Sequence, residues 1–177
     1  MNIIMRSSDP YLLEPYPTNV VHLMQERLMV FHVNPKRITA KNIEAAVDNL
    51  ASPKDAEIFY MRYKEHIKLS EIAERTGTTS SSVGAATSRV FIKIYRYLTA
   101  CLDVIEATDG KEHSIYYLGF DDRKNDMLLK AGYDTIESLY DETPDTISNI
   151  KYLGGSRSME IYNAIQGWKA KHPETVN

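Results

Sequence analysis

A stretch near the middle of the chain, residues 68–96, constrains the fold most. It reads KLSEIAERTGTTSSSVGAATSRVFIKIYR. Ile72 and Ala73 supply the inward face of a short helix, and Gly77 supplies the positive φ at which such a helix ends. A second, longer helix then carries apolar residues at spacings of three and four, namely Val83, Ala86, Val90, Ile94 and Tyr97. Two helices joined by so short a turn predict a helix-turn-helix, whose second helix usually lies in the DNA major groove.

The start and the polar side of the second helix supply the candidate DNA contacts. Thr79 or Ser80 caps the helix, small residues follow, and three cations continue at spacings of four and three. The candidate residues are Thr79, Ser80, Ser81, Ser82, Gly84, Ala85, Ser88, Arg89, Lys93 and Arg96. The serines are expected to lie near base edges or phosphates, and the cations are expected to contact the DNA backbone. The alternative is that the row of cations is an ordinary solvated helix face.

One segment carries a family resemblance. Ile72-Ala73-Glu74-Arg75-Thr76-Gly77-Thr78-Thr79, followed by Val83, is similar to region four of bacterial sigma factors, the part that reads a promoter element. The likeness extends from Thr39 to about Leu98 and implies duplex DNA and RNA polymerase as partners. Those sigma factors usually carry charged and amide side chains where this chain has serine, glycine and alanine, which make no bidentate contacts to bases. The resemblance therefore implies the fold without the promoter specificity.

The last third of the chain predicts short helices joined by tight turns. Asp121 or Asp122 caps a helix that stops at Gly132, Thr135 caps another, and Thr143-Pro144 opens a third. A final helix follows the sequence Ile150-Lys151-Tyr152-Leu153-Gly154, which is a helix-hairpin-helix signature. The glycine of such a hairpin lets a phosphate approach the amides at the start of the next helix.

This region resembles the C-terminal domain of the bacterial RNA polymerase alpha subunit. The likeness rests on residues 129–139 and on Tyr152-Leu153-Gly154, and it spans roughly Ser114 to Ala170. It implies that Arg123, Gly154, Ser156 and Arg157 contact DNA. Asp126 falls where the family commonly has asparagine, and its charge should repel phosphates. Ser156 stands where the family has lysine, and Arg157 stands on the usual serine, although a shift of one residue in the turn would align Ser158 instead.

The sequence predicts an N-terminal extension over residues 1–35, a helix-turn-helix domain over 36–106, a linker over 107–113 and a helix-hairpin-helix domain over 114–172. In the extension, Asn19 is expected to cap an apolar helix that is either core packing or a dimerisation arm. The net charge is −3, but residues 36–100 carry 11 basic and 7 acidic side chains, whereas residues 101–177 carry 8 and 14. The middle of the chain is therefore the better candidate for a phosphate-facing surface.

Other classes of function find little support in the sequence. Cys101 is the single cysteine and lies on an apolar stripe, so it is expected in the core. Without a transmembrane run or a leader pattern, the sequence predicts a cytoplasmic, nucleoid-associated protein. No catalytic arrangement, metal site or cofactor is expected. The chain is therefore predicted to be an all-α, DNA-binding transcription regulator that works with RNA polymerase. The alternative is a protein-interaction module that binds polymerase, a sigma factor or a second copy of itself.

Overall fold

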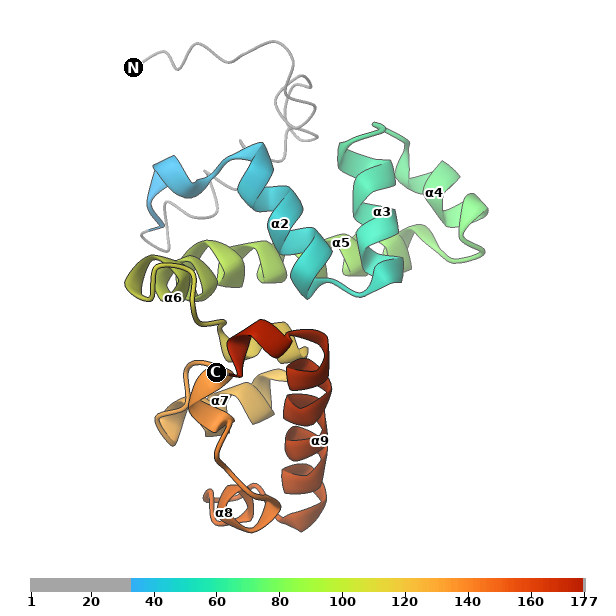
Figure 1. Cartoon of the computed structure of the whole chain (residues 1–177). Helices are drawn as coiled ribbons and strands as arrows, with labels where there is room; N and C mark the ends of the chain where they lie inside the picture. The colour runs from blue at the N-terminus through green and yellow to red at the C-terminus, as the bar shows by residue number, and fades with distance from the viewer. Residues whose placement is uncertain (1–32, 177) are drawn as a thin grey trace. The chain divides into compact units, whose positions relative to one another are not determined.

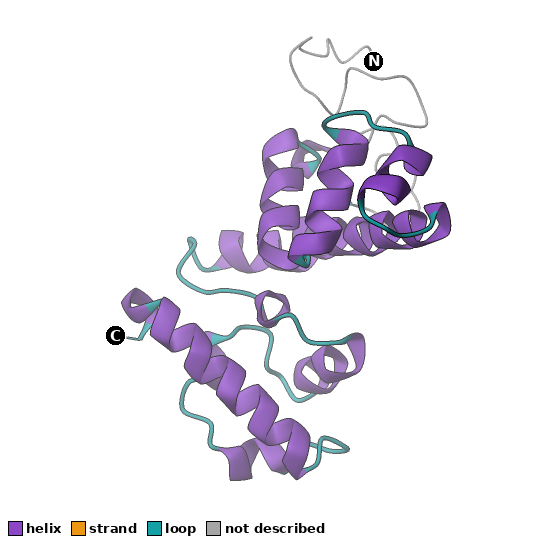
Figure 2. Cartoon of the chain, turned by 90° about the vertical axis from the view of Figure 1, so that its right-hand side faces the viewer, coloured by secondary structure: helices purple, strands orange, loops and turns teal. Residues whose placement is uncertain are grey.

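The structure, a computed structural model, describes residues 33–176 and is all-α, as the sequence predicts. Apart from one isolated bridge between Ser114 and Thr135, every regular element in this range is helical. The chain divides into two compact units, Met1–Thr99 and Ala100–Asn177 (Figure 1). Figure 2 shows that both units are built from helices joined by short loops. The apolar helix expected after Asn19 lies outside the described residues.

The first unit packs three shorter helices against one long helix. Helix α5 contacts each of α2, α3 and α4 and runs along one side of the unit (Figure 1). The elements in chain order are a 3₁₀ turn η1 (Pro35–Arg37), α2 (Ala40–Leu50), α3 (Pro53–Tyr63), α4 (Leu69–Arg75) and α5 (Ser80–Arg96). The two helices expected within residues 68–96 are thus confirmed as α4 and α5.

Local capping signals in the sequence fix where these helices begin. The Thr39 hydroxyl accepts the Asn42 amide at 3.2 Å at the start of α2. At the start of α3 the Ser52 hydroxyl accepts the Asp55 amide at 3.2 Å, and Pro53 occupies the first turn, where its missing N–H removes no helical hydrogen bond. Both starts follow from these residue types alone, because the capping signal is contained within four residues.

The core of the first unit holds α5 in place against its neighbours. Five side chains that are at most 6 % exposed join α3, α4 and α5, namely Ile58, Ile72, Ala73, Val83 and Ala86. An aromatic group lies beside them, in which the ring centroids of Phe59 and Tyr63 are 4.9 Å apart and those of Tyr63 and Phe91 are 5.5 Å apart. The Tyr63–Phe91 pair is edge-to-face, and such a pair fixes orientation as well as burying area. The direction of α5 is therefore set by two sets of buried contacts.

A single π-helical turn, Tyr97–Cys101, follows α5, and α6 (Leu102–Ala107) follows the turn. Helical conformation therefore continues beyond α5 as far as Ala107. Cys101 is fully buried, and burial raises the pKa of its thiol to about 12. A thiol that stays protonated and inaccessible is a poor nucleophile, which agrees with its expected place in the core.

The second unit packs short helices against α9, and α8 makes the closest pairing with it. The elements after α6 are η3 (Ile115–Leu118), α7 (Asp122–Lys130), η4 (Glu137–Leu139), α8 (Pro144–Ser148), α9 (Gly155–Lys171) and η5 (Pro173–Thr175). The expected caps of α7 and α8 are confirmed, since Asp121 accepts the Lys124 amide and Thr143 accepts the Thr146 amide. Thr135 accepts the Ser138 amide, but the segment that follows it is a 3₁₀ turn.

Candidate nucleic-acid interface

The turn between α4 and α5 positions the start of the candidate interface. Gly77 has φ +62°, a conformation that side chains with a Cβ rarely adopt, and the Thr78 amide donates to the Ala73 carbonyl at 2.9 Å. Thr79 then caps α5, because its hydroxyl accepts the Ser82 amide at 3.1 Å. These three local features end one helix and begin the next, as the sequence predicted.

Helix α5 has one buried face and one exposed face. Val83, Val90 and Ile94 are fully buried. The opposite side carries Ser81, Ala85 and Ser88, which are all exposed and are spaced by four and three residues. At the start of the helix Thr79, Ser80 and Ser82 are also exposed, whereas Gly84 is half-buried. The candidate residues from Thr79 to Ser88 therefore gather at one end of one helix.

The exposed face is made of short side chains and ends in an apolar residue. Ile92, four positions after Ser88, is 51 % exposed and was not among the predicted residues. The first turn of α5 contains no acidic residue. The amides of Ser80 and Ser81 have no acceptor within the helix, and they lie at its N-terminus, which is the positive end of the helix dipole. Hydroxyls, free amides and methyl groups can contact phosphates and thymine methyls, but they discriminate weakly between base pairs.

The cations on α5 differ from the expected free row. Arg89 is held by Asp55 of α3 in a bidentate ion pair, with Nε–Oδ2 at 2.8 Å and Nη2–Oδ1 at 2.7 Å. The Asp55 side chain is only 14 % exposed, whereas that of Arg89 is 57 % exposed, so the pair is partly shielded from solvent. It links α3 to α5. Lys93 and Arg96 are half-buried. Arg89 therefore has a structural partner 34 residues away, which no local pattern in the sequence indicates.

The pair makes a testable contribution to stability. A double-mutant cycle with Asp55→Asn and Arg89→Gln is expected to give a coupling of about 1 kcal/mol, because the geometry is bidentate but Arg89 is largely exposed. The hydrogen bonds from Arg89 hold the pKa of Asp55 below its ordinary value of 3.8. A lowered folded-state pKa means that this stabilisation is present above about pH 4 and is lost as the pH falls further.

Chemical denaturation of the four proteins at pH 7 measures the coupling. Repeating the cycle at about pH 3 tests the sign, since this pH lies below the ordinary pKa of 3.8 that the carboxyl has in the unfolded chain, so part of the stabilisation is lost and the coupling should shrink. A coupling that is the same at both pH values would contradict the assignment of the stabilisation to this ion pair.

The candidate residues of the second unit are only partly brought together. Gly154 has φ +73° and is exposed, and Ser156 is exposed as the second residue of α9. Arg157 instead turns back, and its Nη1 donates to the Tyr152 carbonyl at 3.3 Å. Arg123 is exposed on α7, where it lines a groove together with Asp126. Acidic groups lie close by, since Lys124 pairs with both Asp121 and Glu160 at 3.0 Å.

Tyr152 is the residue that sequence reasoning missed in this unit. Its side chain is 72 % exposed and its φ is +70°. A bulky residue in this region of backbone space costs on the order of 1 kcal/mol or more. The available signal was its place in the hairpin, one residue before Leu153-Gly154, but the sequence does not reveal the sign of φ.

The described part of the chain offers little for other kinds of site. Among residues 33–176, no group of three or more histidine, cysteine, aspartate or glutamate side chains is arranged to hold a metal ion. None of the helices in that range combines the length and the apolar character needed to cross a bilayer.

Comparisons with known proteins assign no family to the chain. No family model, curated protein or solved structure matches the chain.

Proposed function

We propose that this chain is a transcription regulator that contacts duplex DNA through the outer face of α5 and works beside RNA polymerase. One observation carries the DNA part of the proposal. The face from Thr79 to Ser88 is exposed at the start of a helix whose opposite side is anchored in a core by α3 and α4. Helix-turn-helix proteins use this arrangement, in which a tight turn leads into a long helix with one face packed on other helices and the opposite face exposed.

The chemistry of the face indicates how it would bind. Ser80, Ser81 and Ser82 offer hydroxyls and amides to phosphates, and Lys93 and Arg96 follow on the same helix. The methyl group of Ala85 suits a thymine methyl. No arginine or glutamine stands at the start of the helix, so affinity would come mainly from the backbone and sequence preference would be modest. The polymerase part of the proposal rests on the two sequence resemblances.

A second candidate function is favoured by two specific observations. Arg89 is already paired with Asp55, which removes one cation from the phosphate-facing set. Residues 101–177 carry 14 acidic and 8 basic side chains, a formal charge of −6 that opposes association with a polyanion. A module that binds proteins of the transcription apparatus, with little affinity for DNA, would satisfy both observations.

The salt dependence of duplex binding separates the two functions. With two or three phosphate contacts, the affinity for a random-sequence duplex is expected to fall roughly 10- to 40-fold between about 50 and 200 mM salt. Fluorescence anisotropy of a labelled duplex of about 20 base pairs, titrated with the full chain, measures this. A chain that shows no duplex affinity at the lower salt concentration would eliminate the DNA proposal in favour of the protein-binding one.

A further inference from the structure

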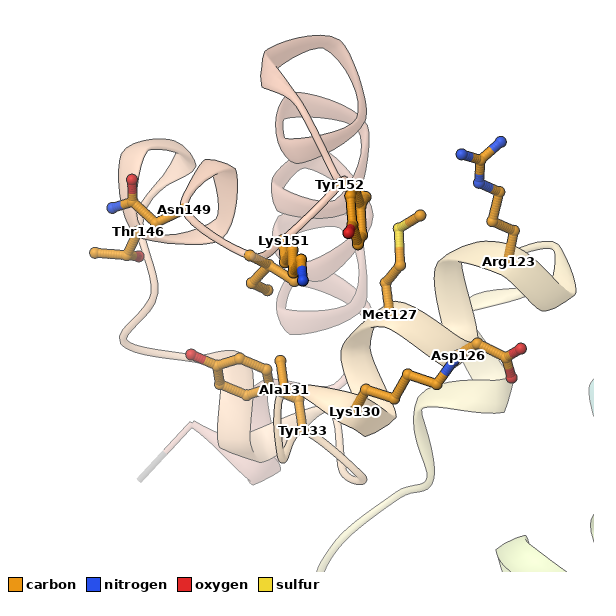
Figure 3. A pocket seen from close by; sticks show the side chains of 11 residues that line it. Arg123, Asp126, Met127, Lys130, Ala131, Tyr133, Thr146, Asn149, Lys151 and Tyr152 are labelled. Carbon is orange, nitrogen blue, oxygen red and sulfur yellow. The ribbon is translucent and has the colours of Figure 1, made fainter.

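A groove in the second unit lies between α7 and the turn that joins α8 to α9 (Figure 3). Its volume is about 1020 Å³, which is enough for several side chains of a bound partner. Met127 and Ile150 form part of an apolar floor. Residues on the rim carry charge or an aromatic ring, namely Arg123, Asp126, Lys130, Lys151 and Tyr152. The groove is therefore amphipathic, with an apolar base and a mostly cationic edge.

The cations on the rim are available for a ligand. Within residues 33–176, the side chains of Arg123 and Lys130 make no ion pair or hydrogen bond. The Nζ atom of Lys151 lies 4.9 Å from the centroid of the Tyr152 ring. Against these three cations the groove lining holds one acid, Asp126, although residues 101–177 as a whole carry a formal charge of −6. The groove is thus a local positive site on an acidic unit.

Tyr152, at the edge of the groove, has a strained backbone conformation. The turn is closed by the Leu153 amide, which donates to the Ile150 carbonyl at 3.0 Å, and Tyr152 is its third residue with φ +70°. Glycine or asparagine normally occupies that position, because a larger side chain strains the backbone. The ring gains little from burial in return, since it is 72 % exposed. An exposed ring that is held at a cost in free energy is a common feature of a binding site.

We propose that this groove binds a short acidic segment of another protein, in which carboxylates flank one apolar or aromatic side chain. The carboxylates would pair with Arg123, Lys130 and Lys151, and the apolar side chain would enter beside Tyr152 and Met127. The flexible thioether of Met127 adapts to side chains of different shape. Nucleic acid fits less well, because a polyanion extends beyond the groove into the negative field of the unit, whereas a short peptide places its few charges inside it.

NMR of the ¹⁵N-labelled full chain tests this with a synthetic peptide that carries four glutamates around one phenylalanine. Chemical-shift changes are expected at the amides of Met127, Lys130, Lys151 and Tyr152, and a control peptide with glutamine for glutamate should bind at least about tenfold more weakly. Lys130→Glu with Lys151→Glu should weaken the acidic peptide by a further tenfold or more. Lys171→Glu, which makes one such charge change on α9 outside the groove, should leave its affinity unchanged.

Tyr152→Gly separates binding from folding. Relief of the positive φ is expected to leave thermal stability unchanged or raised, while the affinity for the peptide falls about fivefold or more. A peptide that binds without shifts in the groove, or that is indifferent to Lys130→Glu with Lys151→Glu, would overturn the proposal. So would a single-stranded oligonucleotide that shifts the same amides at lower concentration than the peptide does, since the groove would then be a nucleic-acid site.

Discussion

A glutamate in place of Ala85 is expected to lower the affinity of the chain for duplex DNA by about 100-fold or more, roughly 2.7 kcal/mol. Ala85 lies in the centre of the exposed face of α5, between Ser81 and Ser88. A carboxylate there would face phosphates and acceptor groups of the bases at close range. The side chain points to solvent in the free protein, and glutamate is a good helix former, so the free energy of unfolding should change by less than about 0.5 kcal/mol.

Anisotropy with a labelled duplex measures the affinity, and thermal unfolding measures the stability. Ala170→Glu is the matched control, because it makes the same change of residue and charge at an exposed position of α9. It should reduce the affinity by no more than about threefold, through net charge alone. Duplex affinity of Ala85→Glu within twofold of that of the parent chain would remove the outer face of α5 from the interface.

Phe59→Ala is expected to destabilise the first unit by about 3–5 kcal/mol, which is a large part of the stability of a domain of this size. Phe59 is fully buried, and its ring centroid lies 4.9 Å from that of Tyr63 and 6.0 Å from that of Phe91. Truncation leaves a cavity between α3 and α5 and removes these ring contacts together with a third, to Tyr60 at 6.1 Å. This packing anchors the buried face of α5. The Phe59→Ala variant should therefore lose duplex affinity as the temperature is raised, in step with the unfolding of the first unit.

Urea denaturation followed by circular dichroism measures the loss. Trp168 is the single tryptophan and lies in the second unit, so its emission reports that unit separately. Phe59→Leu keeps much of the apolar volume and should cost less than about 2 kcal/mol. A loss below 1 kcal/mol for Phe59→Ala would mean that the aromatic group does not support α5.

The sequence predicted those parts of the fold whose signals are local. The starts of α2 and α3 and the cap of α5 follow from Thr39, Ser52 and Thr79, since a capping side chain bonds to an amide only three residues away. The buried stripe of α5 follows from helical period in the same way. Such features need no knowledge of the rest of the chain.

Features that depend on distant partners or on backbone conformation were not predicted. The ion pair between Asp55 and Arg89 joins residues 34 apart in the chain, and a cation on a helix carries no mark of its partner. The π turn at Tyr97–Cys101 and the positive φ of Tyr152 are likewise choices of backbone geometry that a non-glycine sequence does not reveal. For the candidate site, the exposed serines were therefore foreseen, but the altered role of Arg89 was not.

The short side chains on the outer face of α5 have a consequence for the energetics of any docking there. Immobilising a long arginine or glutamine side chain at an interface costs about 0.5–1.5 kcal/mol of rotational freedom, whereas a serine hydroxymethyl or an alanine methyl group has little to lose. Contacts made by Ser81, Ala85 and Ser88 would thus be individually weak but nearly free of an ordering penalty. Such a surface is suited to rapid exchange among many similar targets, with brief occupancy at each.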